Sequence, residues 1–234
     1  MDTIDTNRDQ KLEQALVAQL SGRALAKWTP ENALRFQELM SYCRCVLKEL
    51  EARLWTVGED DLLRRGSNPV EAVASELKTP ERIAEAVKEG GFALTAESLE
   101  QNLPDLAEVQ VRCAFPSDVY RVADALLKQE GIRLLQKEDF ISERASEGYR
   151  GLRLLVTVPV VLRGRRREVR ASVVLRTAAM ELWCGAELRF RERGDGFLQE
   201  QVGEELRECA KLIAEWDQRM EQVRYNIKHR VITK

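Results

Sequence analysis

The chain has 234 residues, of which 44% are hydrophobic and 32% are charged, and this suffices for one domain with its own core. Its 37 basic and 39 acidic residues nearly cancel, which indicates neither a general affinity for nucleic acid nor a disordered acidic chain. No apolar run reaches the roughly 18 residues of a membrane span, and the first residues lack the basic and apolar parts of a secretion signal. We therefore expect a cytoplasmic protein without membrane contact.

The chain has a single histidine, His229, near the end of the sequence. A triad that uses histidine would need this residue to fold back into a site, and a multi-histidine metal centre is excluded. The cysteines include no second pair that would complete a zinc site, so we interpret them as buried thiols.

The first elements in chain order are helical. Residues 1–28 resemble an extension, in which one face of a short helix carries Leu12, Leu16 and Leu20. The Thr-Pro-Glu sequence at 29–31 predicts a helix start, because a capping hydroxyl precedes a proline and an acid. Apolar residues then recur at steps of three and four, which predicts one buried stripe consisting of Phe36, Met40, Cys43, Leu47, Leu50 and Leu54.

Helices and strands then alternate. A second Thr-Pro-Glu sequence at 79–81 predicts a short helix that the glycines at 90–91 end. Apolar and polar residues alternate over 108–113, which predicts a half-buried strand. The Ser-Asp pair at 117–118 predicts a capped helix, after which residues 132–136 favour another strand.

A hairpin follows. Residues 152–162 are apolar and rich in valine, and the Arg-Gly-Arg sequence at 163–165 allows a turn. Period two places one set of return-strand residues in the core, namely Val169, Ala171, Val173 and Leu175. The opposite, site-facing set is Arg170, Ser172, Val174 and Arg176. Thr177 is positioned to cap the next helix, which we expect to run to about Arg193.

The last predicted helix carries an apolar seam with steps of four and three, as in helices that pack along one another. The seam consists of Val202, Leu206, Cys209, Ile213, Trp216, Met220, Val223 and Ile227. We expect it to pair antiparallel with the helix at 32–55, while the remaining surface serves a homo-oligomer or a protein partner. The whole pattern predicts an α+β fold, in which a mixed β-sheet is flanked by helices, with long N- and C-terminal helices.

The predicted organisation has three parts: an N-terminal extension at 1–28, a central domain at 29–193, and a long C-terminal helix at 194–234 that packs on the domain or on a partner. The basic hairpin turn from Arg163 to Arg167 is interpreted as a solvated tip. Contact of this turn with phosphate, RNA or an acidic partner is the alternative.

Several short segments between 67 and 190 resemble, in their order and spacing, the synthetase domain of the RelA/SpoT family, especially the small alarmone synthetases. They are Asn-Pro-Val-Glu at 68–71, Asp-Leu-Ala at 105–107, Asp-Phe-Ile at 139–141, Glu-Gly-Tyr-Arg at 147–150, and Leu-Arg-Thr-Ala-Ala-Met at 175–180, followed by Trp183 and Glu187. The resemblance implies a nucleotidyltransferase-like fold. It also implies transfer of pyrophosphate from ATP to the 3′-hydroxyl of GDP or GTP, giving guanosine tetra- or pentaphosphate.

Such a transfer needs a metal held by carboxylates and cations around the phosphates. The resemblance places Asp105 at the metal position, Tyr149 against guanine, and Lys78 and Arg176 among the nucleotide-binding residues. We expect Mg²⁺ only if nucleotide binding or activity survives. A retained purine site predicts that Tyr149 is exposed in a cleft, whereas a pure interaction module predicts a covered ring.

Several positions depart from the family pattern. Glu76 and Gln110 stand where the family has arginines, Ala145 where it has a lysine, and Arg153 where it has a histidine. Ser172 stands where the family has a glutamate that serves the metal or the hydroxyl. A carboxylate beside a triphosphate is repulsive, and a serine hydroxyl neither binds magnesium strongly nor accepts the proton.

We therefore expect a catalytically inactive family member that acts as a nucleotide-binding regulator or as an interaction module. The first alternative is an active synthetase, in which Glu138, Asp139 or Glu187 replaces the missing acid. The second alternative is a module associated with RNA or the ribosome through the basic turn at 163–167 and the long helices.

Overall fold

The structure is a computed structural model that describes residues 3–143, 148–193 and 198–229. Its elements in chain order are α1 (Thr3–Ala18), the short 3₁₀ helix η1 (Gly22–Leu25), α2 (Pro30–Arg65), β1 (Val70–Leu77), α3 (Pro80–Gly90), α4 (Ala96–Asn102), β2 (Ala107–Cys113), α5 (Pro116–Leu127), β3 (Arg133–Asp139), β4 (Leu152–Leu162), β5 (Arg165–Thr177), α6 (Ala178–Arg193) and α7 (Leu198–Lys228). Within the described residues, every helix is too short or too polar to cross a membrane.

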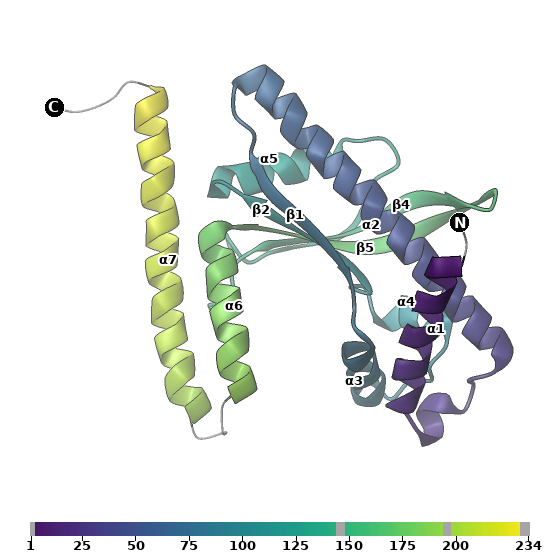
Figure 1. Ribbon diagram of the computed structural model, residues 1–234. Coiled ribbons are helices and arrows are strands. Elements are labelled where there is room, and N and C mark those ends of the chain that lie inside the picture. The colour runs from purple at the N-terminus through teal and green to yellow at the C-terminus, as the bar shows by residue number, and fades with distance from the viewer. Residues whose placement is uncertain (1–2, 144–147, 194–197, 230–234) are drawn as a thin grey trace.

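The centre of the molecule is a five-stranded sheet in the order β1-β2-β5-β4-β3 (Figure 1). Strands β2 and β5 run parallel, whereas the other neighbouring strands run antiparallel. Helix α2 crosses one face of the sheet, and α6 and α7 lie together at one side of the molecule. The predicted α+β fold with a mixed sheet and flanking helices is confirmed.

Helix α2 begins as the sequence predicts. The hydroxyl of Thr29 accepts a hydrogen bond from the amide of Asn32 at 3.3 Å, and Pro30 occupies the first turn. The helix continues past residues 32–55, because no helix-ending signal acts until Gly66 adopts a left-handed conformation after Arg65. The whole predicted stripe is buried, and α2 packs against the sheet while α1 packs against α2 and α3.

Strand β1 and helix α4 are two elements that the sequence pattern does not predict. The register of β1 against β2 shifts between Val70 and Ala72, which breaks the simple alternation of the strand. Alanine and serine also occupy several of its positions, and neither is typical of strands. Pairing with β2 therefore stabilises β1 more than its own sequence does.

The hairpin of β4 and β5 has the predicted turn. Arg163 and Gly164 have φ angles of 50° and 73°, as a two-residue turn requires. The predicted core residues of β5 all belong to the hydrophobic core. Ser172 and Val174 are also shielded from solvent, but they lie outside that core and line cavities on the opposite face. The predicted register of β5 is therefore confirmed.

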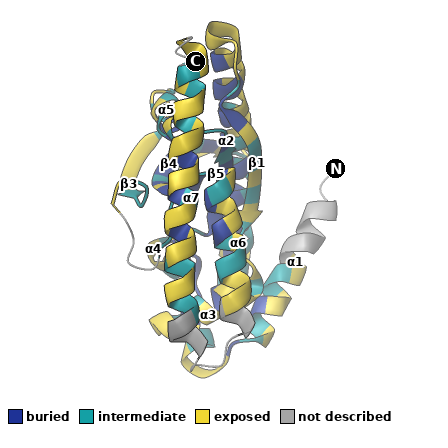
Figure 2. Cartoon of the chain, turned by 90° about the vertical axis from the view of Figure 1, so that its left-hand side faces the viewer, coloured by how far each residue is buried: buried dark blue, intermediate teal, exposed yellow. Residues whose placement is uncertain are grey.

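The predicted pairing of the C-terminal helix with α2 is wrong. Helix α7 instead packs against α6 and α5, because α2 already buries its apolar stripe against the sheet. The buried positions of α7 include two small residues, Ala210 and Ala214, which allow close approach to the domain. Most of the predicted seam points outward (Figure 2), and Trp216 and Ile227 remain 52% and 66% exposed.

Polar contacts hold α7 in place. The buried carboxylate of Asp217 accepts a hydrogen bond from the Thr177 hydroxyl at 2.8 Å. The same hydroxyl accepts from the amide of Met180 at 3.2 Å, which confirms the predicted cap of α6. Thr177 therefore couples the end of β5, the start of α6 and the middle of α7.

The start of α5 depends on α7. No side chain at its own N-cap position, Phe115, makes a capping hydrogen bond. Instead the carboxylate of Glu221 on α7 accepts from the amide and the hydroxyl of Ser117, at 3.1 and 2.8 Å. Arg224 pairs with the buried Asp118 at 2.9 Å. The predicted local cap at 117–118 is thus replaced by a side chain that is distant in the sequence.

Replacement of Asp217 by asparagine should change how stability depends on pH. Burial raises the pKa of the Asp217 carboxyl above its usual value. Since the folded-state pKa exceeds the unfolded one, the charged form opposes folding, and stability decreases as pH rises through the folded pKa. Asp217→Asn keeps an oxygen that accepts from Thr177, so we expect higher stability at about pH 7 and a flatter profile down to about pH 4.

Urea unfolding at several pH values measures this effect. Glu215→Gln, which neutralises an exposed acid of the same helix, is the matched control and should leave the profile almost unchanged. Lower stability of Asp217→Asn at every pH would show that the docked helix needs the charge itself.

Candidate functional site

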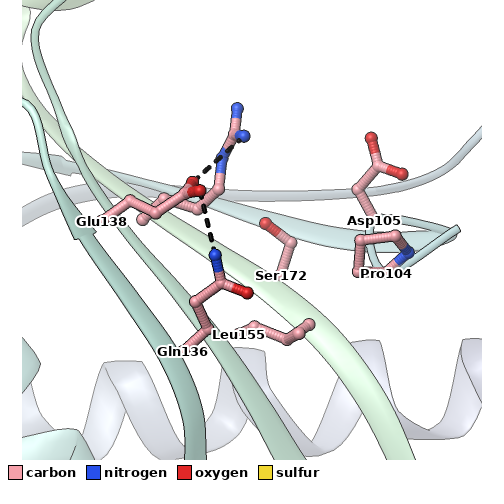
Figure 3. Close-up of a pocket in the computed structure, with 7 residues that line it drawn as sticks. Pro104, Asp105, Gln136, Glu138, Leu155 and Ser172 are labelled. Carbon is pink, nitrogen blue, oxygen red and sulfur yellow. Dashed lines mark hydrogen bonds and ion pairs between the residues drawn. The ribbon is translucent and has the colours of Figure 1, made fainter.

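The face of the sheet opposite α2 contains a cavity of about 170 Å³. Its walls come from β3, β4, β5 and the segment before β2, and consist of Pro104, Asp105, Gln136, Glu138, Arg153, Leu155 and Ser172. Figure 3 shows Ser172 between Glu138 on one side and Asp105 on the other. The structure thus brings together the predicted metal position and the serine that replaces the family glutamate.

Ser172 forms the floor of this cavity. Its side chain is only 2% exposed, and its hydroxyl has no hydrogen-bond partner. In register, Ser172 lies beside Glu108 of β2, which in turn lies beside Glu76 of β1. Directly opposed residues share a face of the sheet, so two carboxylates follow Ser172 in one row. Glu108 is absent from the predicted site, although the alternation over 108–113 already places it on this face.

Lys78 and Asp105 form an ion pair with 2.5 Å between Nζ and Oδ2. The ladder of β1 and β2 ends at the pair of Leu77 and Ala107. Lys78 and Asp105 therefore both lie just beyond the same end of this ladder. The amide of Lys78 also donates to the carbonyl of Leu106 at 2.9 Å, which fixes the two segments together. Two predicted nucleotide-binding residues are therefore each other's partners.

Tyr149 and Arg176 form a second pair. The guanidinium lies over the tyrosine ring, 5.3 Å from its centroid, and Nη2 donates to the hydroxyl at 3.0 Å. Phe140 meets the ring edge-on at a centroid distance of 5.3 Å. The ring is half-buried, and Arg176 lies over it. Arg176 is four residues from Ser172 along β5, or about 13 Å, so the two pairs occupy separate parts of one face.

The chain before Tyr149 is clamped by the last two helices. Gly148 has a φ of 91°, and a side chain there would come within 2.9 Å of Cβ of Ala210 and 3.1 Å of the Trp183 ring. The indole of Trp183 donates to the carbonyl of Leu206 at 2.8 Å, which ties α6 to α7 at this level. Only glycine combines this φ with so close an approach.

Of the three acids considered as replacements for the missing glutamate, only Glu138 lines the cavity. Its carboxylate pairs with Arg153 at 3.5 Å and accepts a hydrogen bond from the side-chain Nε2 of Gln136 at 3.1 Å. Asp139 instead accepts from the Tyr120 hydroxyl and from two backbone amides that follow it. Burial alone would raise its pKa, but these hydrogen bonds outweigh burial and lower it. Glu187 lies on α6, away from the cavity lining. Ala145 lies outside the described residues.

The residues around Asp105 do not fit the magnesium ion that the resemblance implies. Asp105 is already neutralised by Lys78, and Ser172 offers an uncharged hydroxyl where a second acid would be needed. In the part of the chain that the structure describes, no three or more His, Cys, Asp or Glu side chains are arranged to hold a metal ion. Magnesium sites in proteins rely on carboxylate oxygens.

Comparison with known proteins identifies the family. The model of the region found in RelA/SpoT proteins matches residues 75–195. The chain is 30% identical, over 183 residues, to the GTP pyrophosphokinase YwaC of Bacillus subtilis, which covers 78% of this chain and 87% of that protein. The chain therefore belongs to the RelA/SpoT family of GTP pyrophosphokinases.

Solved structures agree with the fold. Small alarmone synthetase 2 of Bacillus subtilis is 27% identical with a TM-score of 0.69, over 81% of this chain and 97% of that one. Small alarmone synthetase 1 of the same organism, bound to its product pppGpp, has a TM-score of 0.73 at 21% identity, over 83% and 98%. The resemblance predicted from the short segments is confirmed.

A double-mutant cycle should detect the pairing of Tyr149 with Arg176. We expect Tyr149→Leu and Arg176→Met to be non-additive, with a coupling energy of about 1–2 kcal/mol in the free energy of unfolding, because a cation–π contact and a hydrogen bond are lost together. Urea unfolding of the four proteins measures the coupling. In the matched control cycle, Tyr149→Leu is combined with Arg166→Met, which changes an exposed arginine instead of Arg176. The effects of these two substitutions should be additive. Additivity in both cycles would contradict the pairing.

Proposed function

We propose that this RelA/SpoT family member does not synthesise guanosine tetra- or pentaphosphate, and that it acts as a nucleotide-binding regulator or an interaction module. The observation that carries the proposal is the row of Glu76, Glu108 and Ser172 across the sheet. Where the resemblance places an arginine for ATP and an acid for the metal, this row presents a carboxylate and a buried hydroxyl. Negative charge there opposes the binding of a triphosphate.

The cations on this face of the sheet support the same conclusion. Lys78 is paired with Asp105, Arg153 with Glu138, and Arg176 with Tyr149. A phosphate group would have to compete with each of these partners. In the family, the reaction brings two nucleotides together, so uncompensated phosphate charge would accumulate in this site.

The regulator and the interaction module differ in what they bind. Relatives of this chain include a GTP pyrophosphokinase and a synthetase bound to pppGpp, so a guanine nucleotide is the first ligand class to test. Binding a purine on Tyr149 would require Arg176 to move from the face of the ring that it covers. Calorimetry with GDP, GTP, ATP and guanosine tetraphosphate separates the two roles, because only the regulator binds one of them at micromolar concentration.

The purified protein should form no guanosine tetra- or pentaphosphate from ATP and GDP or GTP. Loss of one charge-stabilising group commonly reduces a rate by roughly a hundred- to a thousandfold, and here several such groups are replaced. Ser172→Glu alone should not restore synthesis, because Glu76 and Gln110 still replace the cations of the family. Thin-layer separation of labelled products at high enzyme and magnesium concentrations is the measurement. The proposal would be contradicted if the unmodified protein synthesised these products and Asp105→Ala abolished the synthesis.

That outcome would favour the active alternative. One observation supports it: Glu138 reaches the same cavity as Asp105 and Ser172. In that case Glu138→Gln should abolish synthesis as completely as Asp105→Ala, whereas Glu187→Gln should not.

The basic hairpin turn offers less positive charge than its sequence indicates. Arg167 turns back, pairs with Glu100 at 2.6 Å and lies over the Tyr42 ring. Arg163, Arg165 and Arg166 remain exposed at the tip. At this turn, the RNA-associated alternative therefore has these three side chains to use, in addition to the long helices.

Helix α7 has a free apolar surface, which we propose is covered by a second copy of this chain. The exposed seam includes Trp216, Met220, Val223 and Ile227, which follow the heptad spacing typical of paired helices. The exposed charges of α7 are mostly acidic before Trp216, where Glu204, Glu205, Glu208 and Glu215 stand with Lys211, and basic after it, at Arg219 and Lys228. Antiparallel pairing of two α7 helices places opposite charges together, whereas parallel pairing does not.

Light scattering should therefore give the unmodified protein the mass of a dimer or a larger assembly. Trp216→Glu combined with Val223→Glu should produce a monomer that remains folded, because both side chains point away from the domain. Gln222→Glu adds a charge to an exposed position outside the seam and should leave the assembly intact. A strict monomer for the unmodified protein would contradict the self-association.

A further inference from the structure

We infer that Lys78 takes the place of a divalent cation at Asp105, so that this site receives its ligand without metal. The inference rests on the proposed function, because a site without a metal position has no use for a magnesium-bound triphosphate. It identifies Lys78 and Ser172 together as the residues that determine whether the site is metal-dependent.

Backbone pairing holds Lys78 at Asp105. Lys78 directly follows β1 and Asp105 lies just before β2, at the end of the ladder that these strands form. The hydrogen bond from the Lys78 amide to Leu106 continues the ladder by one step. Because the strands fix both backbones, the ammonium group meets the carboxylate without a large search of conformations. The Lys78 side chain is only 15% exposed, whereas the Asp105 side chain is 40% exposed, so the pair is buried on the lysine side and open to solvent on the aspartate side.

A divalent ion at Asp105 would have to displace this ammonium group. The mostly buried ammonium group of Lys78 would then lose Asp105 as its acceptor and lie beside the doubly charged ion, which is strongly unfavourable. The gain would be small, since Ser172 contributes only a neutral oxygen. The other nearby acids are engaged, because Glu138 pairs with Arg153 and Glu108 accepts from Gln110 at 3.1 Å.

The pair still allows Lys78 to act on a ligand. An ammonium group has three N–H donors, and Asp105 takes one of them in this structure. The unpartnered hydroxyl of Ser172 lines the same cavity as Asp105. A nucleotide hydroxyl that reaches Asp105 would therefore meet a carboxylate already paired with an ammonium group, in place of a metal with its waters. The matching ligand is a nucleotide free of chelated metal.

Manganese alone is a direct probe of this inference, measured as the loss of the free Mn²⁺ paramagnetic resonance signal on titration of the full chain. We expect the unmodified protein and Ser172→Glu to bind Mn²⁺ only weakly, because Lys78 still occupies the carboxylate. Lys78→Met combined with Ser172→Glu presents two acids without the ammonium and should bind at least about tenfold more tightly. Asp105→Asn added to this double variant should abolish the gain.

Two outcomes would overturn the inference. One is tight binding of Mn²⁺ by the unmodified protein that Asp105→Asn abolishes. The other is equal affinity of Ser172→Glu and the double variant, since Lys78 would then have no influence on the metal. The circular dichroism spectrum of each variant reports whether it is folded.

Thermal unfolding of the unmodified protein provides a measurement that needs no glutamate at the buried position 172. We expect the same Tm with EDTA and with about 10 mM Mg²⁺ at matched ionic strength, because a bound ion would raise Tm by mass action. A Mg²⁺-dependent rise that Asp105→Asn removes would overturn the built-in cation. Such a result is compatible with the absence of synthesis, so it would contradict this inference and leave the proposed function intact. Product formation, in contrast, would contradict the proposed function whatever the Mn²⁺ titration shows.

Discussion

Strand β5 is hydrogen-bonded to β2 along one edge and to β4 along the other, so each of its side chains is committed to one of two faces. Val173 and Leu175 enter the core beneath α2, while Ser172 and Arg176 point to the opposite side. The strand ends at Thr177, whose hydroxyl starts α6 and holds α7 through Asp217. The register of β5 therefore determines the composition of the core, the lining of the cavity and the attachment of the last two helices. A shift of this register by one residue would exchange the two faces of the strand.

Local signals in the sequence predict much of this fold. The capping hydroxyl of Thr29, the turn at 163–164 and the alternation along β5 each act over a few residues, and the structure confirms them. The partner of α7 is a different matter, because the strongest apolar seam in the chain is left outside. The surface that docks uses small and charged residues such as Ala214 and Glu221, and no hydrophobic pattern distinguishes these from ordinary solvent-facing positions.

The candidate site likewise contains residues that the sequence predicts and residues that only the structure reveals. The order of short segments locates Asp105 and Tyr149, because family spacing survives in the sequence. Their partners depend on which strand ends meet, so Lys78 beside Asp105 emerges only from the β1–β2 ladder, and β1 itself is hidden by its irregular register. Glu108 is the exception, since the sequence places it with Gln110 and Arg112 on one face of β2, in alternation with buried residues on the other face.

The clamp at Gly148 connects surfaces that are far apart in the sequence. Because Gly148 lies against Ala210 and Trp183, the backbone just before Tyr149 rests directly on the inner side of α7. The outer side of the same helix carries the exposed seam. The same helix thus contacts the backbone next to the aromatic ring on one side and presents the seam on the other, so a rotation or tilt of α7 would press on Gly148 and shift Tyr149.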